Sequence, residues 1–374
     1  MKAEYRKLGE IIELIDERNT DGNVQNLIGV SIDKCFIKSV ANTIGTDLRK
    51  YQVIRKFDFA CSLMQVSRDG KIPIACLRDY DEAIMSPAYY IFRVKNTKEV
   101  LPDYLEMWFM RKEFDREASY IAVGGVRGSM PWEDFCDMKL PVPAIEKQQK
   151  IVDAYNAITK RIKIKQKINE KLEKTAQCLF DELFMGNNDD LIELNEIIEV
   201  NPERTLKKGE VYKCFDMSSL PTKNAIPFEY ELKEYNGGMK FRNGDTLMAR
   251  ITPCLENGKA AYINLLDEKE IAFGSTEFIV LSAKNDFPSS FNYFLVRNPD
   301  FITYAIKHMN GSSGRQRVSG EDIGRFMIQR PKNEDLEKFD LLGSEVLKKM
   351  KESSLEIAKL QELKQLVISR ISGM

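Results

Sequence analysis

Two glycine-rich loops carry the arginines with the clearest potential for chemistry. One reads Gly-Gly-Val-Arg-Gly-Ser at 124–129, and the other reads Gly-Ser-Ser-Gly-Arg-Gln-Arg at 311–317. Glycine and serine let a backbone approach phosphates closely, and a guanidinium binds a phosphate or grips the O6 and N7 atoms of guanine. The candidate contacts to nucleic acid are Arg127, Ser129, Arg315 and Arg317. A solvated surface loop is the alternative for either loop alone, but the recurrence favours a functional role.

A second group of short polar side chains lies in the later half of the chain. It comprises Met-Ala-Arg-Ile-Thr-Pro at 248–253, Glu-Asn-Gly-Lys at 256–259 and Gly-Ser-Thr-Glu at 274–277. Such side chains can reach base edges in a DNA groove, but the same residue types also cap turns, and the sequence leaves both roles open. The candidates from this group are Arg250, Thr252, Asn257, Lys259, Ser275 and Thr276.

No self-sufficient catalytic site accompanies these residues in the sequence. The chain has no Gly-x-x-x-x-Gly-Lys-Ser/Thr loop for ATP and no glycine-rich turn for a dinucleotide or adenosylmethionine. Its single histidine, His308, excludes histidine-rich zinc sites. Acid-x-Lys triplets such as Glu231–Lys233 occur in metal-dependent nucleases, but chance produces them in a chain with 30% charged residues. We therefore predict no catalytic residue, no metal site and no bound cofactor.

Composition and charge limit the class of protein. A chain of 374 residues, 43% of them hydrophobic, suits two or three folded units. Seven cysteines without a Cys-x-x-Cys pair fit reduced thiols, and no apolar run approaches the roughly 20 residues of a membrane span. The start of the chain lacks a signal core, so we expect a cytoplasmic protein with no membrane partner. Because the net charge is −1, any DNA-facing surface must be a local patch.

The chain contains an internal repeat. Leu8–Leu14 reappears as Leu194–Val200, and Arg127–Asp134 reappears as Arg315–Asp322. Strand-like runs at 52–54, 88–94, 246–249 and 277–281 alternate with turn signals, and helical patterns cover 103–116 and 291–307. We therefore predict an α+β fold with two mixed α/β domains at 1–143 and 187–331. Each domain precedes a long helix, at 144–186 and at 332–374.

Both long segments carry a heptad seam of the same phase. Eight of ten seam positions are apolar in the first segment and seven of ten in the second. The apolar seam residues that we predict to join the helices are Ile151, Tyr155, Ile158, Ile162, Leu172, Leu179, Leu183, Phe339, Val346, Met350, Ile357, Leu360, Val367 and Ile371. Such stripes suit a two-stranded coiled coil of helices about 60 Å long. The alternative, two helices packed separately on their own domains, is disfavoured by their length.

The whole chain resembles the DNA-specificity subunit of type I restriction-modification systems. The segments that carry the resemblance are Leu8–Ile12 and Leu194–Ile198, Gly244–Pro253 with Glu256–Lys259 and Gly274–Phe278, Arg127–Pro143 running into Ile145–Ile151, and Leu363-Lys364. The first domain departs from the pattern, with Met85–Tyr89 and Asp69–Lys71 in place of the Gly-Ser-Thr-Glu and Glu-Asn-Gly-Lys strings. The second long helix also departs, because Asn333–Glu337 replaces a glutamine-rich string. Arg68 and Lys71, in the first-domain turn, complete the candidate DNA contacts.

The resemblance implies a non-catalytic, pseudo-twofold protein. Each of two target-recognition domains would read one half of a split site in double-stranded DNA, and two antiparallel helices would hold the domains apart. The implied partners are two modification (methyltransferase) subunits and the restriction subunits. Adenosylmethionine, ATP and Mg²⁺ would be bound by those partners. Modules that read one face of B-DNA sit about a helical turn, roughly 34–36 Å, or more apart, which helices of this length can span.

Three alternatives stay open at this point. A specificity subunit of a type IIB-like system would share the same architecture. A free-standing metal-dependent nuclease would need a carboxylate site in this chain. A coiled-coil adaptor between proteins would have the seams without DNA contacts.

Overall fold

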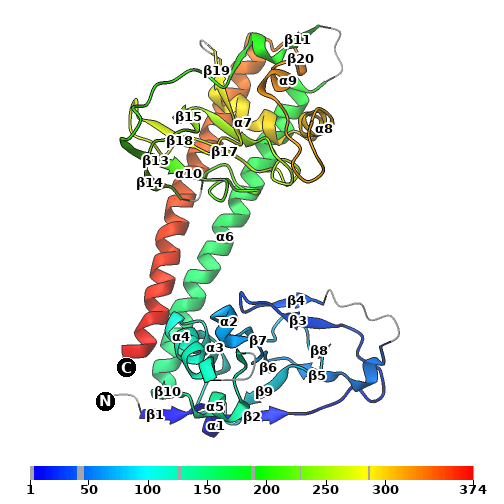
Figure 1. The fold of residues 1–374 in the computed structure, drawn as a ribbon, viewed down its shortest axis with the longest axis vertical. Helices are drawn as coiled ribbons and strands as arrows, with labels where there is room; N and C mark the ends of the chain where they lie inside the picture. The colour runs from blue at the N-terminus through cyan, green and yellow to red at the C-terminus, as the bar shows by residue number, and fades with distance from the viewer. Residues whose placement is uncertain are drawn as a thin grey trace. The chain divides into compact units, whose positions relative to one another are not determined.

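The structure is a computed structural model, and it describes residues 4–39, 46–124, 128–186, 190–227, 229–284 and 287–373. The chain forms two compact units, Met1–Lys160 with Leu360–Met374 and Arg161–Lys359. Each unit combines a mixed α/β body with part of each of two long helices (Figure 1). The predicted α+β class is confirmed. The division into four sequence segments stays a prediction, since each compact unit includes pieces of both helices.

The first unit is built around a four-stranded antiparallel sheet of order β2-β9-β6-β7, and β1 pairs with β10, β3 with β4 and β5 with β8. Its strands are β1 (Glu4–Lys7), β2 (Ile12–Ile15), β3 (Ile28–Val30), β4 (Phe36–Lys38), β5 (Gln52–Arg55), β6 (Phe59–Cys61), β7 (Ile74–Cys76), β8 (Glu82–Met85), β9 (Tyr90–Val94) and β10 (Lys139–Val142). Its short helices are α1 (Leu8–Ile11), α2 (Val66–Asp69), α3 (Pro102–Phe109), α4 (Lys112–Ile121) and α5 (Trp132–Asp137), with 3-10 turns at Leu48–Lys50 and Ala122–Gly124.

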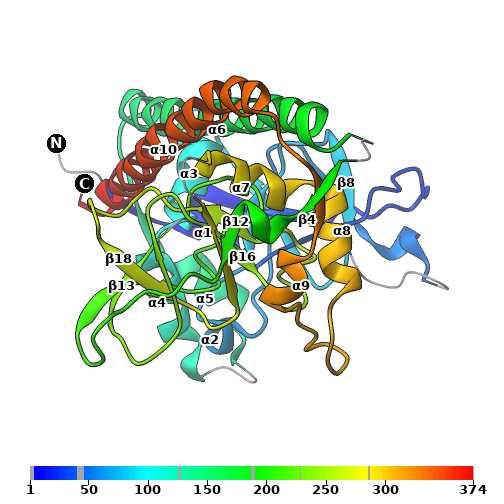
Figure 2. The ribbon, with the colours of Figure 1, turned by 90° about the horizontal axis from the view of Figure 1, so that it is seen from above.

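The second unit has two four-stranded sheets, of orders β12-β19-β16-β17 and β14-β13-β18-β15, and a β11-β20 pair. Its strands are β11 (Leu191–Glu193), β12 (Ile198–Val200), β13 (Val211–Phe215), β14 (Glu231–Glu234), β15 (Met239–Arg242), β16 (Thr246–Ala249), β17 (Ala260–Tyr262), β18 (Ile271–Gly274), β19 (Phe278–Ala283) and β20 (Met327–Gln329). Its short helices are α7 (Ser289–Arg297), α8 (Pro299–Lys307) and α9 (Gly320–Gly324), with a 3-10 turn at Leu194–Glu196. Helix α7 lies between the β12-β19-β16-β17 sheet and the two long helices (Figure 2).

The two bodies are copies of one fold. The sheet order β2-β9-β6-β7 in the first corresponds to β12-β19-β16-β17 in the second, and the β1-β10 pair corresponds to β11-β20. Matching turns precede β6 and β16. Asp58 Oδ2 accepts the Arg55 amide at 3.0 Å, and Asp245 Oδ2 accepts the Arg242 amide at 2.7 Å. These shared turns align Asp58 of the first copy with Asp245 of the second.

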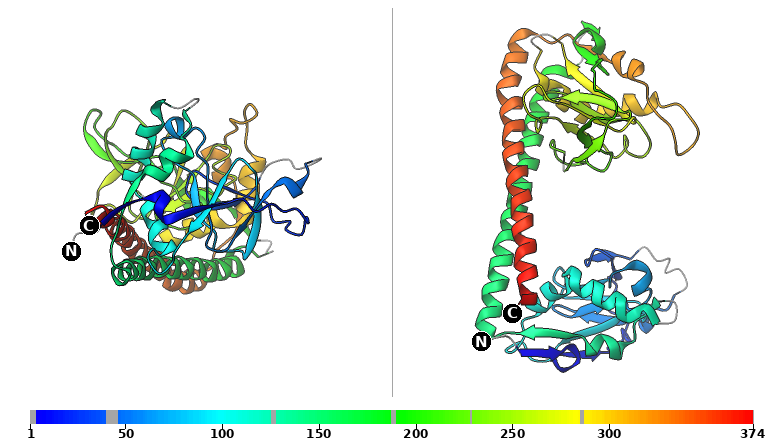
Figure 3. Two further views of the ribbon diagram at one scale, coloured as in Figure 1. Left: turned by 90° about the horizontal axis from the view of Figure 1, so that it is seen from below. Right: turned by 60° about the vertical axis from the view of Figure 1, so that its left-hand side comes forward.

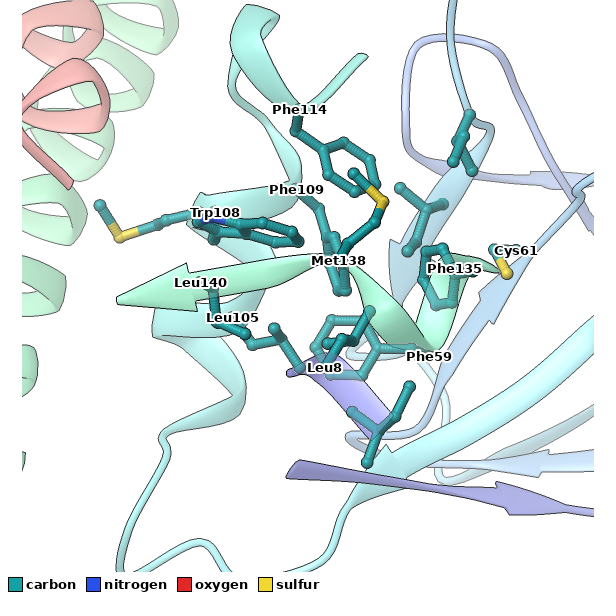
Figure 4. Packing of buried hydrophobic residues seen from close by; sticks show 14 of the residues in the cluster. Leu8, Phe59, Cys61, Leu105, Trp108, Phe109, Phe114, Phe135, Met138 and Leu140 are labelled. Atoms are coloured by element: carbon teal, nitrogen blue, oxygen red, sulfur yellow. The ribbon is translucent and has the colours of Figure 1, made fainter. Parts of the chain in front are cut away.

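Aromatic side chains fill the core of the first unit. The rings of Phe59 and Phe92 stack with centroids 5.3 Å apart, and the Trp108 and Phe114 rings lie 4.9 Å apart. Figure 4 shows Phe135 and Met138 entering this cluster from the segment that leads to β10. Burying each such side chain contributes roughly 1.5–3 kcal/mol, so this cluster holds the β-sheet, α3, α4 and α5 together.

The long helices are α6 (Ile145–Phe184) and α10 (Asn333–Ser369), the latter followed by a 3-10 turn at Arg370–Gly373. In the second unit their order is antiparallel, because Arg161 bonds to Glu356 with Nε and Oε1 2.8 Å apart, while the ring of Phe180 packs on Phe339 at 5.4 Å. In the first unit the Lys364 ammonium lies 4.6 Å from the centre of the Tyr155 ring. Within each unit the two helix segments therefore lie side by side (Figure 3, right).

The predicted seam residues all lie at buried or half-buried positions. The buried ones are Tyr155, Ile162, Phe339, Val346, Met350 and Ile371, and the half-buried ones are Ile151, Ile158, Leu172, Leu179, Leu183, Ile357, Leu360 and Val367. Two polar seam positions also face the partner helix or the interior. Lys165 Nζ lies 2.5 Å from Glu356 Oε2, and Asn169 is 6% exposed with no hydrogen-bond partner for its Oδ1 atom among the described residues.

Candidate nucleic-acid interface

The structure joins the two groups of second-half candidates into one surface. The segment that follows β16 runs beside the end of the loop between α8 and α9. The Thr252 amide donates to Gln316 O at 3.1 Å, and the Val318 amide donates to Arg250 O at 3.0 Å. An antiparallel bridge also pairs Ile251 with Arg317. This loop projects from the body of the second unit (Figure 3, right).

An arginine–glutamate pair lies at the centre of this surface. Arg317 Nε donates to both carboxylate oxygens of Glu277, at 2.9 and 2.8 Å, and Nη2 donates to Oε1 at 2.6 Å. These hydrogen bonds lower the pKa of Glu277 and raise that of Arg317. The positive charge of Arg250 lowers the Glu277 pKa further. The carboxylate is therefore ionised at neutral pH and holds the Arg317 guanidinium in a fixed orientation.

The remaining arginines are less tied to the fold. Arg250 is half-buried, and its Nε atom has no hydrogen-bond partner among the described residues. Arg315 is exposed. Together, Arg250, Arg315 and Arg317 bring three positive charges beside the carboxylate of Glu277, on a chain of net charge −1. Such a local patch is what the composition requires of any DNA-facing surface.

Two neighbouring candidates take part in local contacts. The hydroxyl of Ser275 accepts the Glu277 amide at 3.1 Å, so Ser275 shapes the turn ahead of β19. Thr252 Oγ1 lies 4.0 Å from Met309 Sδ. Thr276 is exposed beside them.

The Asn257–Lys259 turn is held from within the protein. Lys259 Nζ donates to Met217 O at 2.7 Å, and Asn257 is exposed. Gly258 O accepts Arg297 Nη1 at 2.7 Å, and Arg297 Nε lies 3.4 Å from the Glu173 carboxylate on α6. Arg297 was not among the predicted site residues, because an arginine inside a helical pattern does not differ in sequence from a solvated one.

The first-unit candidates lie near one another but carry fewer free charges. Arg68 is exposed and pairs with Asp69 at 2.8 Å, and Lys71 is exposed. A Cβ atom added to Gly128 would meet Ser67 Oγ at 2.2 Å, so the Gly128-Ser129 segment lies against α2. Arg127 lies outside the described residues.

The copies differ at the place where the second unit has its charged cluster. Met130 donates its amide to Leu63 O at 2.9 Å, as Val318 does to Arg250 O, so Leu63 corresponds to Arg250 and Ser129 to Arg317. The Ser86 hydroxyl accepts the Ala88 amide at 3.3 Å, as Ser275 does for Glu277, so Ala88 corresponds to Glu277. One scaffold therefore presents two different sets of side chains.

The described part of the chain has no cluster of three or more His, Cys, Asp or Glu residues arranged to hold a metal ion. Among the same residues, no helix has the length and apolar character that a membrane crossing requires.

Comparison with known proteins agrees with this architecture. Residues 2–174 match the family model of the type I restriction modification DNA specificity domain. The EcoAI specificity subunit of Escherichia coli is 34% identical over 132 residues, covering 33% of this chain and 22% of that protein. The MjaVIII specificity subunit of Methanocaldococcus jannaschii is 28% identical over 160 residues, covering 42% of this chain and 37% of that protein. These matches span less than two thirds of either relative.

A solved structure extends the likeness in fold to the whole chain. The crystal structure of the S subunit of a type I restriction-modification system from M. genitalium has a TM-score of 0.58 at 13% sequence identity. The alignment covers 98% of this chain and 95% of that one. The fold of the whole chain, with its duplicated α/β body, is thus the fold of that S subunit. The resemblance to the type I restriction-modification DNA specificity family seen in the sequence is confirmed.

Proposed function

We propose that this chain reads a bipartite DNA sequence for a type I restriction-modification complex. The observation that carries the proposal is the duplication of one α/β scaffold with divergent side chains at the same place. Arg250, Glu277 and Arg317 in one copy correspond to Leu63, Ala88 and Ser129 in the other. Two scaffolds of one design with different contact residues suit a site whose two halves differ in sequence.

The partners in this proposal are double-stranded DNA, two modification subunits and the restriction subunits, in the cytoplasm. The long helices would serve as the scaffold on which these subunits assemble. The chain itself would be non-catalytic, and adenosylmethionine, ATP and Mg²⁺ would be bound by the partners. The near-zero net charge agrees with this division, because partner subunits can supply much of the phosphate contact.

The test is methylation by the purified complex of this chain with its methyltransferase partner. We expect methylation at one two-part sequence, and none by the methyltransferase alone. Methylation that ignores sequence would contradict the proposal. A cleavage assay on the isolated chain with Mg²⁺ or Mn²⁺ is the control for the nuclease alternative, and no cleavage is expected.

A further inference from the structure

We propose that Glu277 is a positioning residue that orients Arg317 for a two-pronged contact with a guanine, whereas Arg315 beside it contacts the phosphate backbone. The inference rests on the proposed function and deepens it, because it divides the arginines of one surface between sequence recognition and general affinity. It concerns the second unit alone.

The guanidinium of Arg317 retains N–H donors for a ligand. A guanidinium has five N–H groups. Nε is used by Glu277, one N–H of Nη2 is used by Glu277 Oε1, and one N–H of Nη1 donates to Arg315 O at 3.1 Å. One N–H remains on each terminal nitrogen, without a partner among the described residues. Two donors on neighbouring nitrogens are what a contact to guanine O6 and N7 needs.

The Arg317 side chain is held in a fixed position. Its backbone is paired on both sides, through the bridges to Ile251 and to Asn310, and the amide and carbonyl of Arg317 exchange hydrogen bonds of 2.9 Å with those of Asn310. The side chain is 40% exposed, so it reaches solvent although its orientation is set by Glu277. A guanidinium oriented before binding loses less entropy on contact and tolerates fewer misplaced acceptors.

Arg315 lies in surroundings that differ from those of Arg317. This residue lies two positions earlier, at the exposed tip of the same loop, and its side chain has no carboxylate partner among the described residues. A mobile guanidinium serves a phosphate well, since phosphate contacts carry charge but no sequence information. The loop thus offers one arginine that a carboxylate orients and one without a carboxylate partner among the described residues.

The experiment uses the complex of the full chain with its methyltransferase partner. The bipartite site is first mapped for the wild-type complex, and binding is then measured on duplexes that carry each single base change. The variants are Arg317→Lys, Glu277→Gln, Glu277→Asp and Arg315→Ala. Arg317→Lys keeps the positive charge but removes the paired N–H donors of the guanidinium. A melting curve of each variant confirms folding.

Arg317→Lys and Glu277→Gln should both lower the discrimination at one guanine of one half-site, by roughly 5- to 150-fold for full loss of the paired contact. The other half-site should be unchanged. Glu277→Asp should restore part of the discrimination, which a merely structural role would not produce. Arg315→Ala should weaken binding to all duplexes alike and reduce the slope of affinity against salt by about one.

Unchanged discrimination at every position in both Arg317→Lys and Glu277→Gln would overturn the inference. A uniform loss of affinity in Arg317→Lys would also overturn it, because that result assigns Arg317 to a phosphate. Neither outcome affects the proposed function, which fails only if the wild-type complex has no bipartite site.

Discussion

At the level of single residues, the second unit depends on carboxylates that orient arginine side chains. Glu277 holds Arg317 at the surface, and Glu173 on α6 lies beside Arg297 in the interior. Arg317 was a candidate from the sequence, whereas Glu277 and Arg297 had no predicted role. Their roles depend on contacts between side chains that lie at least 40 positions apart in the chain. No local sequence pattern records such contacts.

The Glu277–Arg317 pair should make stability depend on pH. Because the pKa of Glu277 is lowered from its ordinary value of 4.5 in the folded chain, the pair stabilises the fold above that value. This contribution is lost as the pH falls through the lowered pKa. At pH 6 we expect the free energy of unfolding of wild type to exceed that of Glu277→Gln by less than about 1 kcal/mol. The difference in urea-unfolding free energy should shrink at pH 3.5, and a difference that grows on acidification would contradict this assignment.

Arg297 should be costly to remove. Its side chain is 11% exposed, and it donates to the carbonyls of Gly258, Thr222 and Asn224. Arg297→Met would leave these acceptors unpaired and the half-buried charge of Glu173 without its cationic partner, although the Tyr293 hydroxyl still donates to Glu173. We expect a loss of about 3–5 kcal/mol in the free energy of unfolding.

The double variant Arg297→Met with Glu173→Gln is the matched control for that prediction. Removing the second charge as well should recover part of the stability. If the double variant is no more stable than Arg297→Met, the half-buried charge of Glu173 does not account for the loss.

Among the elements, strands and long helices were easier to predict than short helices. The predicted strand at 246–249 is β16, and the runs at 88–94 and 277–281 contain or overlap β9 and β19. The helical pattern at 291–307 is two helices, because Asn298 adopts an extended backbone before Pro299 and caps α8. The Asn-Pro pair was a visible signal for that break. The break between α3 and α4, at Met110 and Arg111, had no such signal.

The contact of α10 with α6 depends on a buried ring. Phe339 is fully buried and packs on Phe180, Phe184 and Phe294. Phe339→Ala should therefore destabilise the protein by about 3–5 kcal/mol, measured by urea unfolding. Leu341, two positions further along the same helix, is 81% exposed, and Leu341→Ala should stay within about 0.5 kcal/mol of wild type. Equal effects of the two substitutions would contradict this packing.

For the molecule as a whole, the repeat was the feature that the sequence recorded best. Its displacement near 187 positions recurs in the sheet orders and in the turns at Asp58 and Asp245. A helix seam leaves a signal in the sequence because burial of one helix face every 3.5 residues produces a periodic pattern. The joining of the 250–252 segment to the 310–318 loop could not, because a backbone bridge between distant loops leaves no pattern in residue type.

The central claim is that one duplicated chain sets a two-part DNA sequence. The most direct measurement is a genome-wide map of methylated bases in the host with this gene present and with it deleted. We expect one bipartite motif, with two different halves at a fixed spacing, that is methylated only when the gene is present. Methylation of the same positions in both strains, or of a single uninterrupted motif, would contradict it.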